Sequence, residues 1–428
     1  MSASPIILER HHNTLYLIVA LTMVFMTLVL ATQPLFLRNV LNIGRENAGF
    51  VNANIQVITE ILDLALVGYL GYLSDRFGRI PIIMWGFLVA GITALLAPLS
   101  GWLGVVLGID ALAIFYLARI MMSLGTAAVW PQLSTLTGDY TTKKSRPGML
   151  AKVGFMMAFG ATLVYAVLMQ LPKYVGVEVV MLIPAIVALL GAWLVRQFLV
   201  ETATKLESGS FPLKRVTEMV KTRKELRLSF LAAFTSRNDM VLIGLFLMTW
   251  FIYFGDLVPG VDHNQAAARA GFVIGFIGLV VLLSIPLWGW FIRRHGRVEA
   301  VILGLLLSGL GFLGFSLIIN PMTWWSLLPA LFVGLGQAGC LLAPQILALD
   351  NAEPEIRGSI MGAFNTAGCI GIIFFLQIGG FLFDYMSPTA PLMFTGMANL
   401  LIMVYGLGVK NWRAQDKKTD DPILDYEP

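Results

Sequence analysis

Charged residues are scarce in this sequence of 428 residues, in which Asp, Glu, Lys and Arg make up only 13%. Soluble domains contain about 25% of charged residues. Apolar residues reach 57%, the mean hydropathy is +0.80, and long uncharged apolar runs recur along the chain. A run of about 20 apolar residues crosses the roughly 30 Å hydrocarbon core, where a helix satisfies its own backbone amides. The composition therefore excludes a soluble all-helical protein and predicts an all-α integral membrane protein.

Cysteine is nearly absent, and so are the sequence motifs of enzymes. The two cysteines, Cys340 and Cys369, lie inside apolar runs, which is typical of small packing residues rather than of a disulfide or a metal pair. The sequence contains no phosphate-binding P-loop, no metal-ligand cysteine pair and no nucleophile elbow. We therefore expect no enzyme activity and no bound cofactor, and we expect a gradient rather than ATP to drive any transport.

The apolar runs predict twelve transmembrane helices. The first run begins near Thr14 after a short polar head and lacks a small-residue cleavage pattern, so we expect a retained helix rather than a signal peptide. The expected helices cover residues 14–37, 51–73, 81–99, 111–137, 148–171, 177–199, 240–258, 271–292, 298–319, 324–349, 358–382 and 389–409.

Basic residues predict which side of the membrane each connection faces. If both termini are cytoplasmic, the cytoplasmic segments contain 22 of the 29 Lys and Arg residues, and the outer loops contain only four. The sequence therefore predicts an even number of helices with both termini in the cytoplasm.

A polar stretch divides the chain into two parts of similar size. We expect a first six-helix bundle over residues 1–200, a cytoplasmic linker over 201–239, a second bundle over 240–410 and a cytoplasmic tail over 411–428. The linker carries eight basic residues, including the cluster KTRKELR at 221–227. Nucleic-acid binding is one interpretation of such a run. The membrane helices on both flanks favour instead a segment that lies against anionic lipid headgroups.

The two bundles share an internal sequence repeat. The segment GYLSDRFGR at 71–79 aligns with GWFIRRHGR at 289–297 at a constant offset of 218. A second match, an aspartate seven residues before an arginine, occurs at Asp139 and again at Asp350. Two matches in the same order indicate duplicated halves. This architecture is common among secondary transporters, which bind their cargo near the midplane between the halves.

The first of these segments also resembles a family signature. GYLSDRFGRIP is similar to the sequence G-x-x-x-D-R-x-G-R of the major facilitator superfamily, at its usual place between helices 2 and 3. The stretch 355–384 is similar to helix 11 of that family. The resemblance covers the whole chain in helix count, central loop and repeat. It implies two pseudo-symmetric six-helix bundles that transport a small solute by alternating access.

The signature loop predicts a latch between the halves on the cytoplasmic side. Gly71 and Asp75 are four residues apart and face one side of helix 2, where the glycine permits close approach of another helix. Asp75 would then meet the positive N-terminus of helix 11, while Arg76 and Arg79 would reach carboxylates or headgroups. The second repeat has Arg293 in place of the aspartate, so we expect an asymmetric latch. The predicted gating residues are Gly71, Asp75, Arg76, Gly78, Arg79 and Arg357.

Ionisable residues at membrane depth are costly and usually functional. On helix 2, three polar residues recur at i, i+4 and i+7 and form one face near mid-depth, and helices 4 and 7 carry comparable stripes. One interpretation is a structural ion pair in which Arg119 neutralises Glu60 or Asp63. The other is a set of cavity-lining groups that handle a cation or a proton. The predicted pathway residues are Gln56, Glu60, Asp63, Arg119, Tyr253 and Asp256.

The family resemblance implies further properties of helices 4 and 5. Arg119 is similar in position to an arginine that the family uses in proton coupling, although Ser123 replaces the usual glycine four residues later. Proton-driven drug exporters of the family carry a Gly-Pro motif in helix 5, and this sequence has glycines there but no Gly-Pro. This difference argues against a drug antiporter.

Two segments resemble a magnetosome-membrane branch of the superfamily: SASPIILERHHNTLYL at the start and residues 45–79. This resemblance implies a bacterial inner membrane, or the magnetosome membrane derived from it, and iron or an iron complex as cargo. Oxygen ligands without cysteine suit a site that must release its cargo, so the candidate metal contacts are Glu60, Asp63 and Asp256. The nearby Asp262-His263 pair is either an outer capture site for a divalent metal or a solvated loop.

Two other functions are compatible with the sequence. One is transport or export of a small organic solute or drug, and the other is a non-transporting membrane receptor or assembly factor on the same fold. Buried charges favour transport. A receptor would tolerate neutralisation of these charges and fail when the central loop or the tail is shortened. The expected partners are the lipid bilayer and a small molecule or ion, and we expect no nucleic acid.

Overall fold

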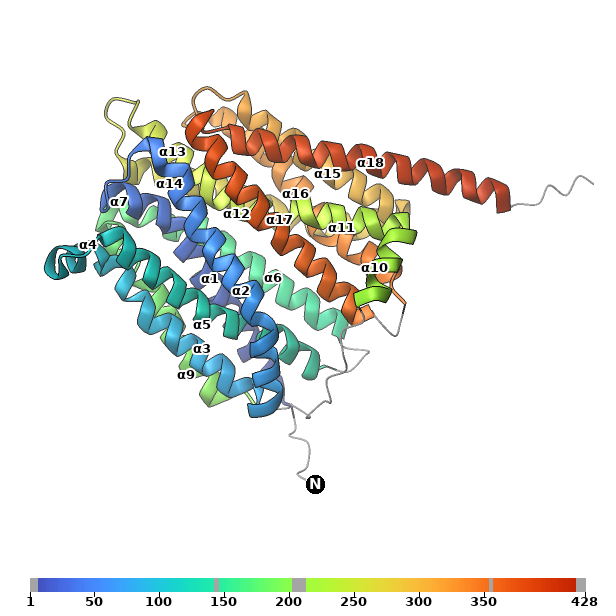
Figure 1. Cartoon of the computed structure of the whole chain (residues 1–428), viewed down its shortest axis with the longest axis horizontal. Coiled ribbons are helices and arrows are strands. Elements are labelled where there is room, and N and C mark those ends of the chain that lie inside the picture. The colour runs from blue at the N-terminus through green and yellow to red at the C-terminus, as the bar shows by residue number, and fades with distance from the viewer. Residues whose placement is uncertain (1–6, 142–145, 202–212, 354–356, 421–428) are drawn as a thin grey trace, which may run out of the picture.

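The computed structural model of the chain describes residues 7–141, 146–201, 213–353 and 357–420, and these residues are helical with short connections (Figure 1). The first half contains α1 (Glu9–Asn39), α2 (Ala48–Phe77), α3 (Arg79–Ala94), α4 (Leu96–Leu107), α5 (Ala111–Asp139), α6 (Arg146–Ala166), α7 (Pro172–Val175), α8 (Val177–Val180) and α9 (Ile183–Phe198). After α10 (Leu213–Thr222), the second half contains α11 (Lys224–Ser236), α12 (Asp239–Leu242), α13 (Met248–Gly255), α14 (His263–His295), α15 (Arg297–Ser316), α16 (Leu327–Asp350), α17 (Arg357–Tyr385) and α18 (Ala390–Asp420).

The helices are long and apolar enough to account for the predicted membrane spans. Ten helical stretches of the described residues meet this requirement, and α3 with α4, which are bent by 43° relative to each other, make an eleventh. The helix α2 is 30 residues long and therefore also exceeds the roughly 20 residues that cross the hydrocarbon core. Its polar residues lower its hydropathy. With α2 as the twelfth span, the predicted all-α membrane architecture is confirmed.

The two halves lie side by side, the first coloured blue to green and the second yellow to red (Figure 1). Within the halves, α3 packs against α5 and α9, and α15 packs against α16 and α18. The halves meet mainly along two helix pairs, α2 with α17 and α6 with α14. Small residues allow this approach, because a Cβ atom on Gly380 of α17 would lie 2.9 Å from the Cβ atom of Ala53 on α2.

The sequence repeat corresponds to a repeated backbone turn. Gly78 precedes α3 and Gly296 precedes α15, and their φ angles are +98° and +103°. Residues with a Cβ atom rarely adopt such angles, so the turn requires glycine. Each glycine ends one helix and starts the next without an intervening loop. The turn therefore fixes how the second and third spans of each half join.

An ion pair also follows the repeat. In the first half, Arg79 Nε lies 2.6 Å from Asp139 Oδ2. In the second half, Arg297 Nε lies 2.6 Å from Asp350 Oδ2. Each arginine belongs to the first sequence match and each aspartate to the second. The two matched motifs of each half are therefore bound to each other, which explains why they recur together.

The seventh membrane span begins earlier than the sequence predicts. We expected a helix over 240–258 after a linker over 201–239, but one helical span runs from Lys224 to Gly255. Within it, the buried hydroxyl of Ser229 donates to the carbonyl of Pro344 on α16 at 2.8 Å. The predicted start was wrong because basic side chains at the beginning of a span keep their charge at the headgroups while their stems cover apolar surface.

The predicted linker also contains α10, which packs against the second half. Val216 and Met219 are buried in a cluster with Ile360 of α17. Arg215 pairs with Glu353 after α16 at 2.5 Å. The described part of the linker is therefore attached to one half rather than suspended between the two.

Candidate functional site

A chain of polar side chains joins α2 to α5 in the first half. Arg119 Nη2 donates to Gln56 Oε1 at 3.1 Å, and Gln56 Nε2 donates to Glu60 Oε1 at 3.1 Å. Arg119 is buried, with 6% of its surface exposed. An amide side chain donates and accepts at once, so Gln56 connects the guanidinium to the carboxylate. The contact between Arg119 and Glu60 is therefore indirect.

The carboxylate of Asp63 is held by α5 one turn further along α2. Ser123 Oγ lies 2.7 Å from Asp63 Oδ1 and 3.2 Å from the carbonyl oxygen of Thr59. A hydroxyl has one proton to donate, and hydrogen bonds to an ionised acceptor are shorter and stronger. Asp63 also interacts electrostatically with Glu60 and Arg119. Ser123 therefore orients the acid.

The second half faces this cluster with a basic residue. Arg237, at the end of α11, acts electrostatically on Glu60 and donates from Nη1 to Asn365 Oδ1 of α17 at 2.6 Å. Gly368 leaves room for this arginine, because a Cβ atom there would overlap its side chain. Cys369 interacts electrostatically with both Glu60 and Arg237. We call the set Gln56, Glu60, Asp63, Arg119 and Arg237 the central polar cluster.

Hydrogen bonds between the halves gather at one end of the molecule, which we call the sealed end. Arg38, at the end of α1, pairs with Asp256 after α13 at 2.9 Å. Asp256 also bonds the ring of His263, and the second ring nitrogen of His263 lies 2.9 Å from Asn39 Oδ1. These contacts tie the end of α1 to the start of α14.

A second group of sealed-end contacts joins α2 and the segment before it to α17 and α13. Asp384 Oδ1 accepts the backbone N–H of Gly49 and Asp384 Oδ2 accepts that of Phe50, each at 2.7 Å. The hydroxyl of Tyr253 donates to the carbonyl of Ile43 at 2.8 Å. The sealed end is therefore closed by contacts from at least three spans of the second half.

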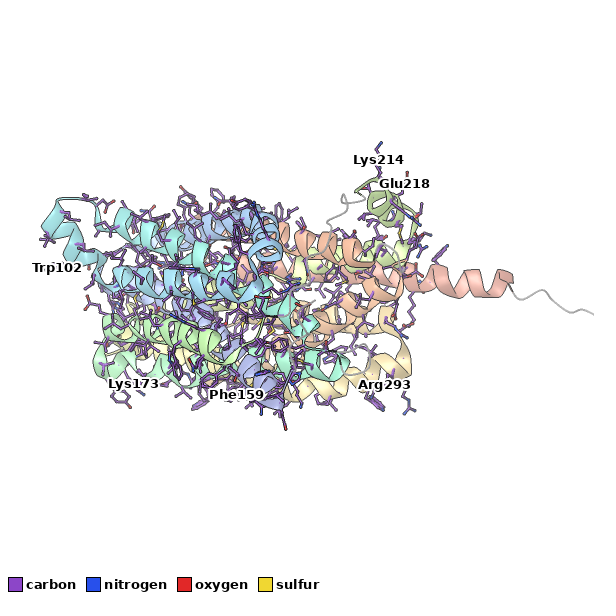
Figure 2. All side chains as sticks on the ribbon, turned by 90° about the horizontal axis from the view of Figure 1, so that it is seen from below. Trp102, Phe159, Lys173, Lys214, Glu218 and Arg293 are labelled. Atoms are coloured by element: carbon purple, nitrogen blue, oxygen red, sulfur yellow. The ribbon has the colours of Figure 1, made fainter. Side chains whose placement is uncertain are left out.

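The opposite end, where α1 begins and α18 finishes, is the terminal end. Figure 2 shows Lys214 and Arg293 at this end, and Trp102 and Lys173 at the sealed end. The ion pairs that described side chains form near the terminal end, such as those of Arg79 and Arg297, join residues of the same half. The central polar cluster thus lies between halves that are tied together at the sealed end.

The structure brings some predicted pathway residues together and not others. Gln56, Glu60, Asp63 and Arg119 form one connected cluster. Tyr253 and Asp256 contribute instead to the sealed end, so the third candidate metal contact is not beside the first two. His263 binds Asp256 there, and in the described residues no three His, Cys, Asp or Glu side chains are placed to hold a metal ion.

The predicted cytoplasmic latch is only partly visible. The surroundings of Gly71 and the side chains of Asp75 and Arg357 are outside the part of the chain that the structure describes. Arg76 is exposed and its guanidinium lies 5.4 Å from the centre of the Phe77 ring. Gly78 and Arg79 take part in the repeated turn and ion pair described above.

Sequence reasoning missed three residues that the structure brings to the site or its seal. Arg237 was placed in the linker because the seventh span was started too late. Arg38 and Asp384 were not singled out, because their partners are distant in the sequence. The signal that could have identified Arg237 is that apolar residues, such as Ala233 and Leu242, occur on both sides of it in the sequence.

Known proteins resemble this chain in sequence and in structure. The family model of the Major Facilitator Superfamily matches residues 15–376 and 240–420. Magnetosome protein MamH of Paramagnetospirillum magneticum is 55% identical over 412 residues, which cover 96% of this chain and 95% of MamH. Magnetosome protein MamZ of Magnetospirillum gryphiswaldense is 37% identical over 92% of this chain, and this match spans 61% of MamZ.

Among solved structures, a peptide transporter POT in complex with sulfate superimposes with a TM-score of 0.73 at 13% identity. The superposition covers 94% of both chains. At this identity the likeness concerns the fold alone.

Proposed function

The chain belongs to the major facilitator superfamily, and on that premise we propose that it is a secondary transporter that moves a small solute by alternating access. The observation that carries the proposal is the central polar cluster, in which Glu60 and Arg237 come from different halves. A solute that enters from the terminal end would bind between bundles that can rock against each other. The sealed end supplies contacts that such a movement would have to break.

The proposed cargo is iron or an iron complex, carried into a magnetosome-type vesicle. Two relatives are named magnetosome proteins, and MamH matches over almost the whole of both chains. Glu60 and Asp63 offer carboxylate oxygens, which bind divalent cations. A site with only a few oxygen ligands binds a cation weakly enough to suit a cargo that has to be released. We propose the bacterial inner membrane or the magnetosome membrane as the location, with both termini in the cytoplasm.

Each residue of the central polar cluster has a role in this proposal. Glu60 and Asp63 contact the cargo, and Arg237 balances the charge of Glu60 when the site is empty. A cation bound by the carboxylates repels the guanidinium, so cargo binding changes the attraction between the halves. Arg119 holds Gln56 and keeps α2 against α5. Asp256, with Tyr253, acts at the sealed end rather than on the cargo.

Transport of a small organic solute is the second candidate function. It is favoured by the mixed charge of the cluster, which has two carboxylates and two guanidinium groups. It is also favoured because the described residues contain no group of three metal-binding side chains. A zwitterionic solute would contact both signs of charge.

The deciding experiment measures uptake of radiolabelled ferrous iron into proteoliposomes under an imposed pH gradient. Wild-type protein is compared with Asp63→Asn and with Asp110→Asn as a matched control. Asp110 is an exposed residue that caps the start of α5 outside the cluster. We expect uptake by wild type and Asp110→Asn, and uptake at least about tenfold slower in Asp63→Asn, equivalent to about 1.4 kcal/mol.

Absence of uptake in every gradient and orientation, from protein that elutes as a single folded species, would reject iron as the cargo. Equal uptake by Asp63→Asn would reject the role of that acid. Organic solutes would then be screened with the same variants. A protein that carries none of them, and whose cellular role tolerates loss of the acids, would be a receptor or assembly factor.

A further inference from the structure

A second polar cluster lies inside the second half, away from the central polar cluster. Ser308 Oγ of α15 donates to Asp239 Oδ2 of α12 at 2.8 Å, and Asn399 Nδ2 of α18 donates to Ser308 Oγ at 3.1 Å. All three side chains are fully buried. Each lies near the middle of its membrane span. An acid is therefore enclosed by three helices of one half at mid-depth.

This cluster has more acceptor atoms than donors. Asp239 Oδ1 and Asn399 Oδ1 are buried, and neither has a hydrogen-bond donor in the described part of the chain. Buried polar atoms without partners are rare, because each costs about 1–3 kcal/mol. Ser308 cannot help, since its single proton is already donated to Asp239 Oδ2. The Ser308 hydroxyl and the two N–H groups of Asn399 supply three donors for four acceptor oxygens, so these three side chains lack one donor. The amide of the neighbouring Asn238 is also buried without a partner in the described residues.

The cluster also lacks a positive charge. No ion pair formed by the described side chains includes Asp239, and the nearby Arg237 binds Asn365 of α17 instead. From α16, the titratable group that faces Asp239 is the thiol of Cys340. From α15 and α18, the described side chains that hydrogen-bond within this cluster are the neutral Ser308 and Asn399. An isolated carboxylate in such surroundings is neutralised rather than left charged.

We propose that Asp239 is a proton-binding site of the second half, with the proton on Oδ1 and donated to Asn399 Oδ1. One proton removes the negative charge and supplies the donor that both oxygens lack. A metal cation would instead require a shell of oxygen ligands. In the described residues, Asp239 is not part of any group of three metal-binding side chains.

The site is connected to the interface between the halves by the seventh span itself. After α12 the span continues as a π-helical turn, Ile243–Leu247, and such turns often occur at functional positions. Gly244 in this turn packs so closely on Tyr165 of the first half that a Cβ atom would overlap the hydroxyl. Loss of the proton separates Asp239 from Asn399, and the movement reaches the other half through Gly244. This coupling step, unlike proton binding, rests on the proposed transport function.

Infrared difference spectroscopy tests proton binding without cargo and without transport. Purified full-length protein in lipid nanodiscs is compared with Asp239→Asn at neutral pH. We expect the difference spectrum to contain the C=O band of a protonated carboxyl, shifted in D2O and lost in the variant. The matched control is Asp384→Asn, because Asp384 is a carboxylate of the same half that accepts two backbone N–H groups. This control should retain the band.

The Asn399→Ala variant tests the hydrogen bond and keeps the proposal testable if Asp239→Asn does not fold. Removal of the acceptor should move the carboxyl band to higher frequency without abolishing it. A band that does not move would overturn the proposed bond. A spectrum in which Asp239 contributes a carboxylate band instead would overturn the proton site. Failure of iron uptake would leave these readings unchanged, so the two proposals can fail separately.

Discussion

In the first half, Glu60 lies where Arg237 of the second half acts on it, and Asp63 lies one turn further along the same helix. In the second half, Asp239 lies inside the bundle among neutral side chains. The position that corresponds to Ser308 at the offset of 218 is Ala90 of α3, which is buried and apolar. Duplication therefore gave both halves the same turns, while the acids moved to different surfaces. The first half presents its acids to the second half, whereas the second half encloses its own acid, Asp239.

The repeated ion pair also differs between the halves, in the exposure of its arginine. The Arg79 side chain is 6% exposed, whereas that of Arg297 is 48% exposed. The two pairs have the same N–O distance, so only their surroundings differ. Burial makes the loss of Arg79 costly, because solvent screens its attraction to Asp139 less than it screens an exposed pair.

The largest expected effect separates these two pairs. We expect Arg79→Ala to lower the free energy of unfolding by about 3 kcal/mol. The matched variant, Arg297→Ala, should lower it by less than about 1 kcal/mol, because solvent screens its exposed pair. Denaturant unfolding in detergent measures both. Equal losses would show that the halves depend on the pair to the same extent.

The second-largest expected effect on stability concerns the hydrogen bond to Asp239. Ser308→Ala removes the donor to Asp239 Oδ2, and we expect a loss of about 2 kcal/mol in the free energy of unfolding. The reciprocal change in the first half, Ala90→Ser, adds a hydroxyl at the matching position, where the described residues show no hydrogen bond to an acid. That change should cost less, since the new hydroxyl can bond a carbonyl of its own helix. A stable Ser308→Ala protein would mean that Asp239 has another donor.

Contacts across the halves should have weaker effects on stability and clearer effects on conformation. The Arg38–Asp256 pair is partly exposed, so Arg38→Gln should destabilise the sealed end by about 1 kcal/mol. Spin labels at exposed Leu107 and Leu257 report the distance between the halves at that end. We expect a larger population of long distances in the variant.

Arg45→Gln is the control for this measurement. Arg45 belongs to the same end, and none of the ion pairs formed by the described side chains includes it. If Arg45→Gln lengthened the distances as much as Arg38→Gln, the effect would come from total charge and not from the pair.

The smallest expected effect concerns Tyr165, whose buried hydroxyl has no partner among the described residues. Tyr165→Phe removes an unsatisfied group, so the free energy of unfolding should stay equal or rise by up to about 1 kcal/mol. Tyr253→Phe removes a hydroxyl that bonds Ile43 and should cost about 1 kcal/mol. Effects of the same sign would show that Tyr165 has a donor or acceptor in solution.

The fold was largely predictable from the sequence. Apolar runs predicted the spans, and the two repeated motifs predicted duplicated halves, because both signals are visible in short stretches of sequence. The acids of helix 2 were also predictable, since Glu60 and Asp63 stand out in an apolar run at helical spacing. The partner of Asp63 was harder to predict, because the polar stripe of helix 4 that contains Ser123 does not show which acid its hydroxyl contacts.

Other features depend on contacts between residues that are distant in the sequence. Asp239 was the last residue of the predicted linker, and nothing local indicates that Ser308 and Asn399 enclose it. Asp256 was placed with the helix 2 acids because it continues a polar stripe on its own helix. Its depth depends on where the seventh span begins and ends. Hydropathy does not fix that limit when basic residues start the span.

The carboxylate of Asp384 has a consequence for the way α2 begins. The residue before this helix, Asn47, forms no side-chain cap, and Asp384 of the other half takes the amides of Gly49 and Phe50 that a cap normally satisfies. The first turn of α2 is thus completed in trans. Any conformation that separates the halves at this end removes Asp384 from those two amides, which must then hydrogen-bond to water. Opening of the sealed end is therefore coupled to fraying of the first turn of α2.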